Sequence, residues 1–304
     1  MRMQFNRIIC ATDFSDFSNR TVNYGLALAK EFDSKIYVCH VIDLSSVAIY
    51  GEFQLDPVGL QDRIMKDAGD QLEELIGKQH KAWEPLITVG HAADEISRIV
   101  EEKNIDLVIT ATRGRSGLKR LILGSVTERL MRTLTCPLLV IHSPDKEFAT
   151  TDDQEVKVES ILVGCDFSPD SGVAFEHSLS LAQEFQSELH LTHVVETSIY
   201  QELHKTETHV EEEIQQEIHD RLLQKLQDMV PEEARNWCKP HTSLLDGHPY
   251  EEIVNYAEAQ SIDMIVLGTR GHGLVKSMLV GSTTDRVVRR APCPVLSVSR
   301  KVQG

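Results

Sequence analysis

Three glycines near the C-terminal end of the chain are spaced so that backbone groups alone could bind an anion. Residues 264–267 form an apolar run that is too short for a helix and is typical of a strand buried on both faces. Gly268 and Gly271 follow it and would let the backbone turn tightly and approach a ligand. Gly281 and Ser282 then open a predicted helix, whose first N–H groups lack partners within the helix. A strand, a glycine loop and a helix N-terminus in this order predict an anion site, most often for phosphate.

The same frame occurs earlier in the chain, at Ala111, Gly114, Gly124 and Ser125. The later loop lacks the Gly-Lys-Ser/Thr ending of a P-loop, which excludes that motif. For one isolated pair of glycines, ordinary turns of an α/β loop would be an equally good interpretation. The recurrence favours a ligand site in both places.

The composition limits the kinds of partner. A net charge of −16 opposes binding to nucleic-acid backbones or to anionic membranes, so a phosphate site must rely on local N–H groups and a few basic side chains. No apolar run approaches the length of about 20 residues that a membrane span needs, and the start of the chain does not resemble a signal peptide. The six cysteines lack CxxC spacing, so we expect buried thiols in a reducing cytoplasm.

The chain is predicted to be a tandem repeat. Asp13-Phe-Ser recurs as Asp166-Phe-Ser, and the His40-Val41 pair recurs as His193-Val194. The glycine frame recurs later in the same order, and self-similarity of this kind indicates repeated structural units. We therefore expect a first domain at residues 1–143, a polar linker at 144–159 and a second domain at 160–304.

Hydrophobic periodicity predicts alternating strands and helices in each domain. In the first domain we expect strands at residues 7–11, 35–42, 84–89, 105–111 and 137–142 and helices at about 15–31, 61–79, 93–102 and 124–133, with 45–59 irregular. Either Ser15 or Ser18 could cap the first of these helices. In the second domain we expect a strand at 160–164, a helix capped by Ser168 and a long helix at 210–229. This alternation predicts parallel sheets with helices on both faces.

The strand order positions the candidate residues. In a doubly wound sheet of order 3-2-1-4-5, ligands bind beyond the carboxyl ends of the strands, where the order reverses. Asp13 and Asp166 follow the first strands, Val41 and Val194 lie at the ends of the second, and the glycine loops follow the fourth. All of these would then meet at one edge of each sheet.

The spacing G-x2-G-x9-G-S at Gly268, Gly271 and Gly281-Ser282 resembles the nucleotide signature of the ATP-binding universal stress proteins. The ends Pro137-Leu-Leu-Val and Pro294-Val-Leu resemble that family too. The resemblance covers both halves and implies two tandem Rossmann-like domains of the adenine nucleotide alpha hydrolase-like type, each with a five-stranded parallel sheet. It also implies a cytoplasmic stress-response protein that binds ATP, with Mg²⁺ arriving on the triphosphate.

The resemblance assigns roles residue by residue. The aspartate after the first strand would bind ribose, the residue at the end of the second strand would bind adenine through its backbone, and the glycines and serine would bind phosphates. The second site comprises Asp166, Val194, Gly268, Gly271, Gly281 and Ser282, and the first comprises Asp13, Val41, Ala111, Gly114, Gly124 and Ser125. From the residues alone, the aspartates could instead serve helix starts, and the valines the strand core.

Ala111 stands where the second domain has Gly268. If that position requires a positive φ, alanine costs about 1 kcal/mol or more, which would weaken binding roughly tenfold. We therefore rank the second site above the first. Arg113, Arg115, Arg270, His272 and Lys276 could neutralise phosphate or could simply be solvated loop charges.

We find no catalytic set and no metal motif. No nucleophile is paired with a base, and no general base accompanies the loops, so at most slow ATP hydrolysis is expected. His190 and His193 point to opposite faces of a strand, and His204, His209 and His219 belong to a solvated acidic segment, so no metal site is predicted.

Three functions remain open. A nucleotide-dependent regulator with an unidentified protein partner is the first, an interaction scaffold with degenerate sites is the second, and a nucleotidyl transferase or pyrophosphatase without recognisable catalytic residues is the third. The last strand of each domain is a sheet edge that needs cover. These edges could pair within one chain, and the chain could also form a homodimer through them.

Overall fold

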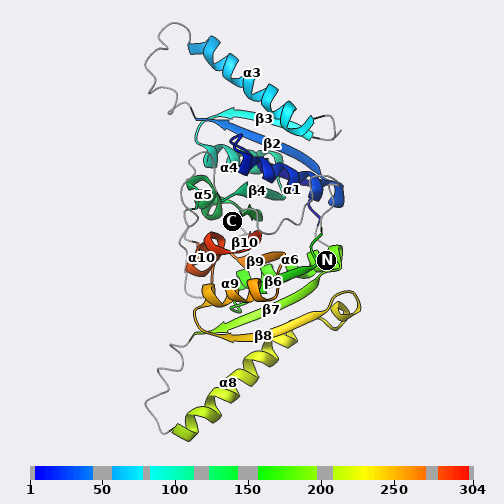
Figure 1. Ribbon diagram of the computed structural model, residues 1–304, viewed down its shortest axis with the longest axis vertical. Coiled ribbons are helices and arrows are strands. Elements are labelled where there is room, and N and C mark those ends of the chain that lie inside the picture. The colour runs from blue at the N-terminus through cyan, green and yellow to red at the C-terminus, as the bar shows by residue number, and fades with distance from the viewer. Residues whose placement is uncertain are drawn as a thin grey trace. The chain divides into compact units, whose positions relative to one another are not determined.

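The computed structural model describes residues 4–43, 57–77, 83–112, 123–142, 157–196, 208–271 and 280–300. The described chain falls into two compact units, an N-terminal unit centred on residues 4–143 and a C-terminal unit that begins at Lys157 (Figure 1). Residues 144–156 of the expected linker lie outside the described residues. Each unit is an α/β domain and is considered separately.

The N-terminal unit contains one parallel sheet of order β3-β2-β1-β4-β5. Its elements are β1 (Arg7–Ala11), α1 (Asp16–Phe32), β2 (Lys35–Ile42), α3 (Pro57–Ile76), β3 (Trp83–Val89), α4 (Ala92–Lys103), β4 (Leu107–Ala111), α5 (Ser125–Thr133) and β5 (Leu138–Ile141). Helix α1 packs against β1, β2 and β4. Helices α4 and α5 pack against each other, α4 also packs against β2, and α5 also packs against β5.

The C-terminal unit repeats this topology, with the parallel order β8-β7-β6-β9-β10. Its elements are β6 (Ser160–Gly164), α6 (Pro169–Phe185), β7 (Glu188–Val195), α8 (Thr208–Asp228), the 3-10 helix η2 (Glu232–Asn236), β8 (Pro240–Asp246), α9 (Pro249–Ala259), β9 (Met264–Gly268), α10 (Ser282–Arg290) and β10 (Val295–Val298). The predicted order 3-2-1-4-5 is confirmed in both units.

Burial of the central strands explains why the sequence forms parallel sheets. All five residues of β4 are buried, and the first four residues of β9 are buried as well. A strand that is apolar along its whole length needs cover on both faces, which the crossover helices provide. The strands therefore lie between helices, and their carboxyl ends open toward the loops that carry the candidate residues.

Helix starts follow the sequence signals with one difference. Ser15 caps α1 by accepting a hydrogen bond from Ser18 N, and Ser168 caps α6, which has Pro169 in its first turn. Helix α3 begins at Pro57, earlier than expected, because proline is well suited to the first turn of a helix. The rest of the segment expected to be irregular, residues 45–56, lies outside the described residues.

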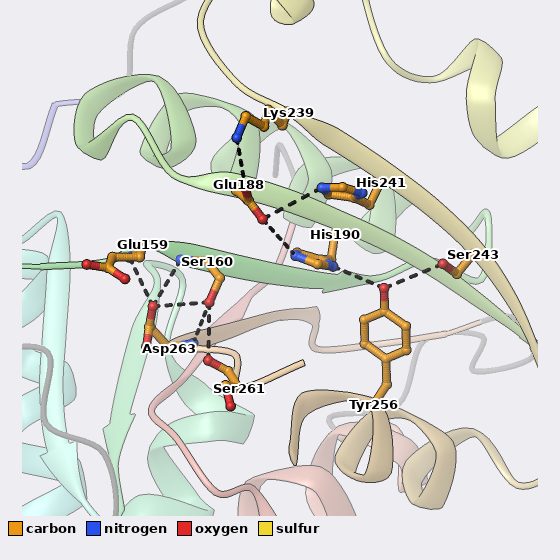
Figure 2. A network of polar contacts seen from close by, with 10 residues as sticks. All are labelled: Glu159, Ser160, Glu188, His190, Lys239, His241, Ser243, Tyr256, Ser261 and Asp263. Carbon is orange, nitrogen blue, oxygen red and sulfur yellow. Dashed lines mark hydrogen bonds and ion pairs between the residues drawn. The ribbon is translucent and has the colours of Figure 1, made fainter. Parts of the chain in front are cut away.

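Two aspartates at repeated positions hold the strand starts together. Asp106 Oδ2 accepts hydrogen bonds from Asn6 N and Arg7 N at 2.9 and 3.0 Å. In the C-terminal unit Asp263 Oδ2 accepts them from Glu159 N and Ser160 N, each at 3.0 Å (Figure 2). These carboxylates lie at the amino ends of the strands, away from the predicted ligand edge. Among the described residues, no helix is both long and apolar enough to cross a membrane.

Candidate functional site

The turn between β6 and α6 places Asp166 at the carboxyl edge of the C-terminal sheet. Ser168 N donates a hydrogen bond of 2.9 Å to Asp166 Oδ1, which fixes the carboxylate against the start of α6. The intervening Phe167 has φ 62°, in the left-handed region that bulky residues rarely adopt. Such a conformation costs about 1–2 kcal/mol, so the surrounding contacts must compensate for it.

The N-terminal unit has the same turn with more hydrogen bonds. Phe14 also has φ 62°. Asp13 Oδ1 accepts hydrogen bonds from Ser15 N at 3.1 Å, from Ser15 Oγ at 2.6 Å and from Ser18 Oγ at 2.6 Å. The two aspartates thus serve the helix starts, as one interpretation of the sequence held, and both lie at the carboxyl end of the first strand.

Gly271 contacts Asp166 directly. A β-carbon at residue 271 would lie 2.6 Å from Asp166 Oδ2, which is closer than real β-carbons come to other atoms. A β-carbon at Gly281 would lie 3.7 Å from Gly271 N and 3.4 Å from Thr269 O. The structure therefore brings Asp166 together with Gly271 and Gly281, which follow it by more than a hundred positions in the sequence.

Gly268 has a different reason to be glycine. A β-carbon there would lie 2.7 Å from the carbonyl carbon of Asp170 and 2.8 Å from Ser171 N, in the first turn of α6. Neither Gly268 nor Ala111 has a positive φ, so the condition behind the expected alanine penalty is not met. Backbone strain at Ala111, the reason for ranking the first site below the second, is therefore not present, and the ranking itself stays a prediction. Gly268 allows close packing of α6 on β9.

Helices α10 and α5 begin without a side-chain cap. Their N-cap residues, Gly281 and Gly124, have extended backbones and no oxygen with which to cap the first turn. Ser282 and Ser125, the first helical residues, are exposed. Backbone N–H groups in the first turn, at the positive end of each helix dipole, therefore donate no hydrogen bond to an N-cap side chain, which is the arrangement that binds anions.

Threonines tie these helices to the preceding strands. Thr284 Oγ1 donates a 2.7 Å hydrogen bond to Gly268 O, and Thr127 Oγ1 donates a 2.8 Å bond to Ala111 O. The equivalent bonds in the two units hold each helix start at the carboxyl end of its fourth strand.

Val194 and Val41 are half-buried near the ends of β7 and β2, beside a histidine that sequence reasoning did not assign. His193 Nδ1 donates a 2.7 Å hydrogen bond to Cys165 O, because a carbonyl can only accept. The ring also lies against Phe167, with centroids 4.7 Å apart. Burial lowers the pKa of His193 and outweighs the carbonyl hydrogen bond, so the ring is neutral at physiological pH.

The N-terminal unit contains the same pair. His40 Nδ1 donates to Thr12 O at 2.9 Å, and the rings of His40 and Phe14 are 4.3 Å apart. The recurring Asp-Phe-Ser and His-Val sequences were the available signal for this contact between phenylalanine and histidine. Read along the sequence, they indicated only that the chain contains a repeat. The structure shows that phenylalanine and histidine form one wall of the carboxyl edge in each unit.

Two charged residues of the C-terminal site were also missed. Lys225 of α8 places Nζ 3.9 Å from the centroid of the Phe167 ring, which is a cation–π contact. The buried Asp170 accepts hydrogen bonds from Arg270 N at 3.2 Å and from Arg300 N at 3.3 Å, which anchors the beginning of the glycine loop. Sequence alone gave no sign of either contact. For Lys225 the reason is that the sequence of α8 is typical of a solvated acidic helix.

Some predicted residues lie outside the described residues. They are Gly114 of the first site and the basic candidates Arg113, Arg115, His272 and Lys276. The second site is described at all six predicted positions.

Comparison with known proteins agrees with this architecture. The family model described as the universal stress protein family matches residues 4–142 and again residues 157–299. A universal stress protein of Methanocaldococcus jannaschii is 33% identical over 47% of this chain and 85% of its own length. Another, of Mycolicibacterium smegmatis, is 25% identical over 96% of each chain. The crystal structure of a universal stress protein from Archaeoglobus fulgidus shares the fold over 98% of this chain and 97% of its own, at 23% identity and a TM-score of 0.66. With two matches that together span most of its length, this chain belongs to the universal stress protein family.

Proposed function

We propose that the chain binds an adenine nucleotide, ATP foremost, at the carboxyl edge of each sheet, and that the C-terminal site binds it more tightly. The contact between the Asp166 carboxylate and Gly271, beside the uncapped start of α10, carries this proposal. A carboxylate next to bare backbone and a helix N-terminus offers hydrogen-bond acceptors for a sugar and donors for phosphates within one small region.

Each group has a defined role in the proposal. The Asp166 carboxylate accepts hydrogen bonds from ribose hydroxyls, and backbone groups of Val194 bind the edge of adenine. The N–H groups at the start of α10 and the Ser282 hydroxyl bind phosphate oxygens. Phe167 and His193 form an apolar wall beside the base. Mg²⁺ accompanies the triphosphate and needs few protein ligands.

The two sites differ at the aspartate. Asp13 Oδ1 accepts three hydrogen bonds from Ser15 and Ser18, including two from hydroxyls. Oδ1 with three donors has little capacity left for a ribose hydroxyl, so only Oδ2 of Asp13 could accept one without rearrangement of the turn. The proposed weaker affinity of the N-terminal site therefore rests on this network and not on Ala111.

The proposed role is regulatory and cytoplasmic. Among the described residues of the second site, His193 Nδ1 donates to Cys165 O, and the buried Asp170 accepts hydrogen bonds from Arg270 N and Arg300 N, so no dedicated base for water is evident. Nucleotide occupancy would change which protein partner, or which second copy of the chain, the molecule binds. ATP turnover would be slow.

Equilibrium dialysis of the full-length chain against labelled ATP, with and without Mg²⁺, tests the proposal. We expect saturable binding with a tighter and a weaker site, and little phosphate release over the same period. Absence of saturable binding at millimolar ATP would overturn the nucleotide proposal and favour the interaction scaffold. Rapid phosphate release would overturn the regulatory part and indicate an ATPase.

A further inference from the structure

Glu188, His190 and His241 form a cluster at the opposite edge of the C-terminal sheet from the proposed nucleotide site. Glu188 begins β7, and His190 follows two residues later on the same face of the strand. His241 lies near the start of β8 and is the register partner of His190. The cluster thus lies at the amino ends of the strands, whereas Asp166 and Val194 lie at the carboxyl ends.

The potential ligand atoms converge. Glu188 Oε2 lies 3.7 Å from His241 Nε2 and 4.0 Å from His190 Nε2, and one ligand atom of each residue lies within 4.8 Å of the others. Figure 2 shows both imidazole rings beside the Glu188 carboxylate. Bonds of about 2.0–2.1 Å to a tetrahedral Zn²⁺ place ligand atoms roughly 3.3 Å apart. Each ligand atom would need to move inward by less than about 1 Å. Because the rings of His190 and His241 are stacked, with centroids 4.8 Å apart, the half-exposed His241 ring would also rotate to direct its Nε2 at the metal.

Neighbouring residues orient two of the three ligands. His190 Nδ1 lies 3.0 Å from the Tyr256 hydroxyl of α9, so a proton on Nδ1 leaves Nε2 as the lone-pair atom directed at Glu188. Histidines that bind metals usually have their second ring nitrogen held in this way. Lys239 Nζ lies 3.3 Å from Glu188 Oε1, which leaves Oε2 directed toward the imidazoles.

The exposure of the three side chains suits a metal site with open coordination positions. His190 is only 6% exposed, whereas the side chains of His241 and Glu188 are 48% and 45% exposed. The cluster therefore has one buried ligand fixed by the fold and two ligands at the surface. Three protein ligands and an open side leave room for water or for another molecule on the metal.

The N-terminal unit shows what the same positions contain when no such cluster is present. Tyr37 pairs with Glu84 in the register that joins His190 to His241. Lys35 occupies the position of Glu188 and forms a 2.6 Å ion pair with Glu84, with its Nζ 4.8 Å from the centroid of the Tyr37 ring. An ordinary ion pair is thus sufficient to build this face, and the fold alone does not require two histidines and a glutamate.

We propose that Glu188 Oε2, His190 Nε2 and His241 Nε2 bind a divalent transition-metal ion, with Zn²⁺ as the first candidate. Two imidazoles and one carboxylate suit Zn²⁺ and its first-row neighbours and do not suit Mg²⁺ or Ca²⁺. The sequence analysis predicted no metal site, and this proposal replaces that prediction. His193 remains outside the cluster, because its Nδ1 is bonded to Cys165 O.

The test uses the metal-free, full-length chain without nucleotide. Calorimetric titration with Zn²⁺ gives stoichiometry and affinity, and titration with Co²⁺ gives the visible absorption bands of a site with few ligands. We expect one ion per chain. His241→Gln and Glu188→Gln should each weaken Zn²⁺ binding at least tenfold and abolish the Co²⁺ bands, because each removes one of three ligands.

His91→Gln is the matched control, because His91 is an exposed histidine in the other unit. It should bind Zn²⁺ as the wild type does. Far-ultraviolet circular dichroism of each variant verifies the fold, and both glutamine substitutions are at half-exposed positions that tolerate them. If the wild type does not bind Zn²⁺, or if His241→Gln and Glu188→Gln bind it with wild-type affinity, the proposal is wrong.

Discussion

Asp166 and Gly271 are in such close contact that a side chain at residue 271 cannot be added without moving the carboxylate. A β-carbon there would lie 2.6 Å from Asp166 Oδ2. The absence of a side chain at 271 therefore leaves room for the proposed ribose-binding carboxylate, which Ser168 N holds in place. It does so without left-handed backbone, because φ of Gly271 is not positive.

Gly271→Ala should weaken ATP binding at the tighter site by about tenfold, a loss of about 1.4 kcal/mol of binding free energy, because the added β-carbon displaces the Asp166 carboxylate. Isothermal titration with ATP measures this change. Gly172→Ala is the control, because a β-carbon at residue 172 meets no atom within 4 Å. Equal affinity of Gly271→Ala and the wild type would show that Asp166 does not contact the nucleotide.

Gly268→Ala should destabilise the C-terminal unit by about 1–3 kcal/mol, the usual cost of overpacking. Its β-carbon would lie 2.7 Å from the backbone of Asp170, which cannot rotate away as a side-chain end could. Urea denaturation followed by circular dichroism gives the free energy of unfolding. Ala111 already has a β-carbon at the equivalent position of the N-terminal unit. Ala111→Gly should therefore lower the free energy of unfolding by less than Gly268→Ala does. A neutral Gly268→Ala would contradict the packing role.

Local sequence patterns were sufficient to predict the elements and their order. Apolar runs such as β4 and β9 indicate strands buried on both faces, and the caps at Ser15 and Ser168 indicate helix starts. Alternating strands and helices then restrict the sheet to very few topologies. The fold could therefore be predicted because each step depends on short-range signals.

The finer features of the sites depend on contacts that no local pattern encodes. The pairing of His190 with His241 depends on the register between β7 and β8, which the sequence does not show when it is read along one strand. The left-handed conformation of Phe167 is held by tertiary contacts, against the preference of the residue itself. The role of Gly268 became visible only once α6 was placed against β9.

His177 in α6 should make the C-terminal unit less stable in mild acid. Its Nδ1 is buried and has no hydrogen-bond partner among the described residues, and burial lowers the pKa of His177 from 6.5 to about 4. The unfolded chain then takes up a proton as the pH falls below about 6.5, whereas the folded chain does so only near 4. Stability is thus fully present above the unfolded pKa and is lost as the pH falls between these values.

Urea denaturation at pH 7 and pH 5 measures this effect, which should reach at most about 2 kcal/mol between the two pH values. His177→Gln cannot be protonated in this range and should show a smaller loss of stability from pH 7 to pH 5. The wild type and His91→Gln, in which the His177 imidazole remains, should show the same loss as each other. A His177→Gln profile parallel to that of the wild type would assign the acid sensitivity to other groups.

Tyr256→Phe should weaken Zn²⁺ binding about tenfold without removing any ligand, since groups that orient metal-binding histidines typically contribute 10- to 100-fold in affinity. The hydroxyl of Tyr256 lies 3.0 Å from His190 Nδ1 and 3.5 Å from Ser243 Oγ, so its loss frees the imidazole to change its tautomer and orientation. Calorimetry gives the affinity, and the Co²⁺ bands should weaken but persist. A merely structural role for Tyr256 would instead lower the urea midpoint and leave the Zn²⁺ affinity of the folded protein unchanged.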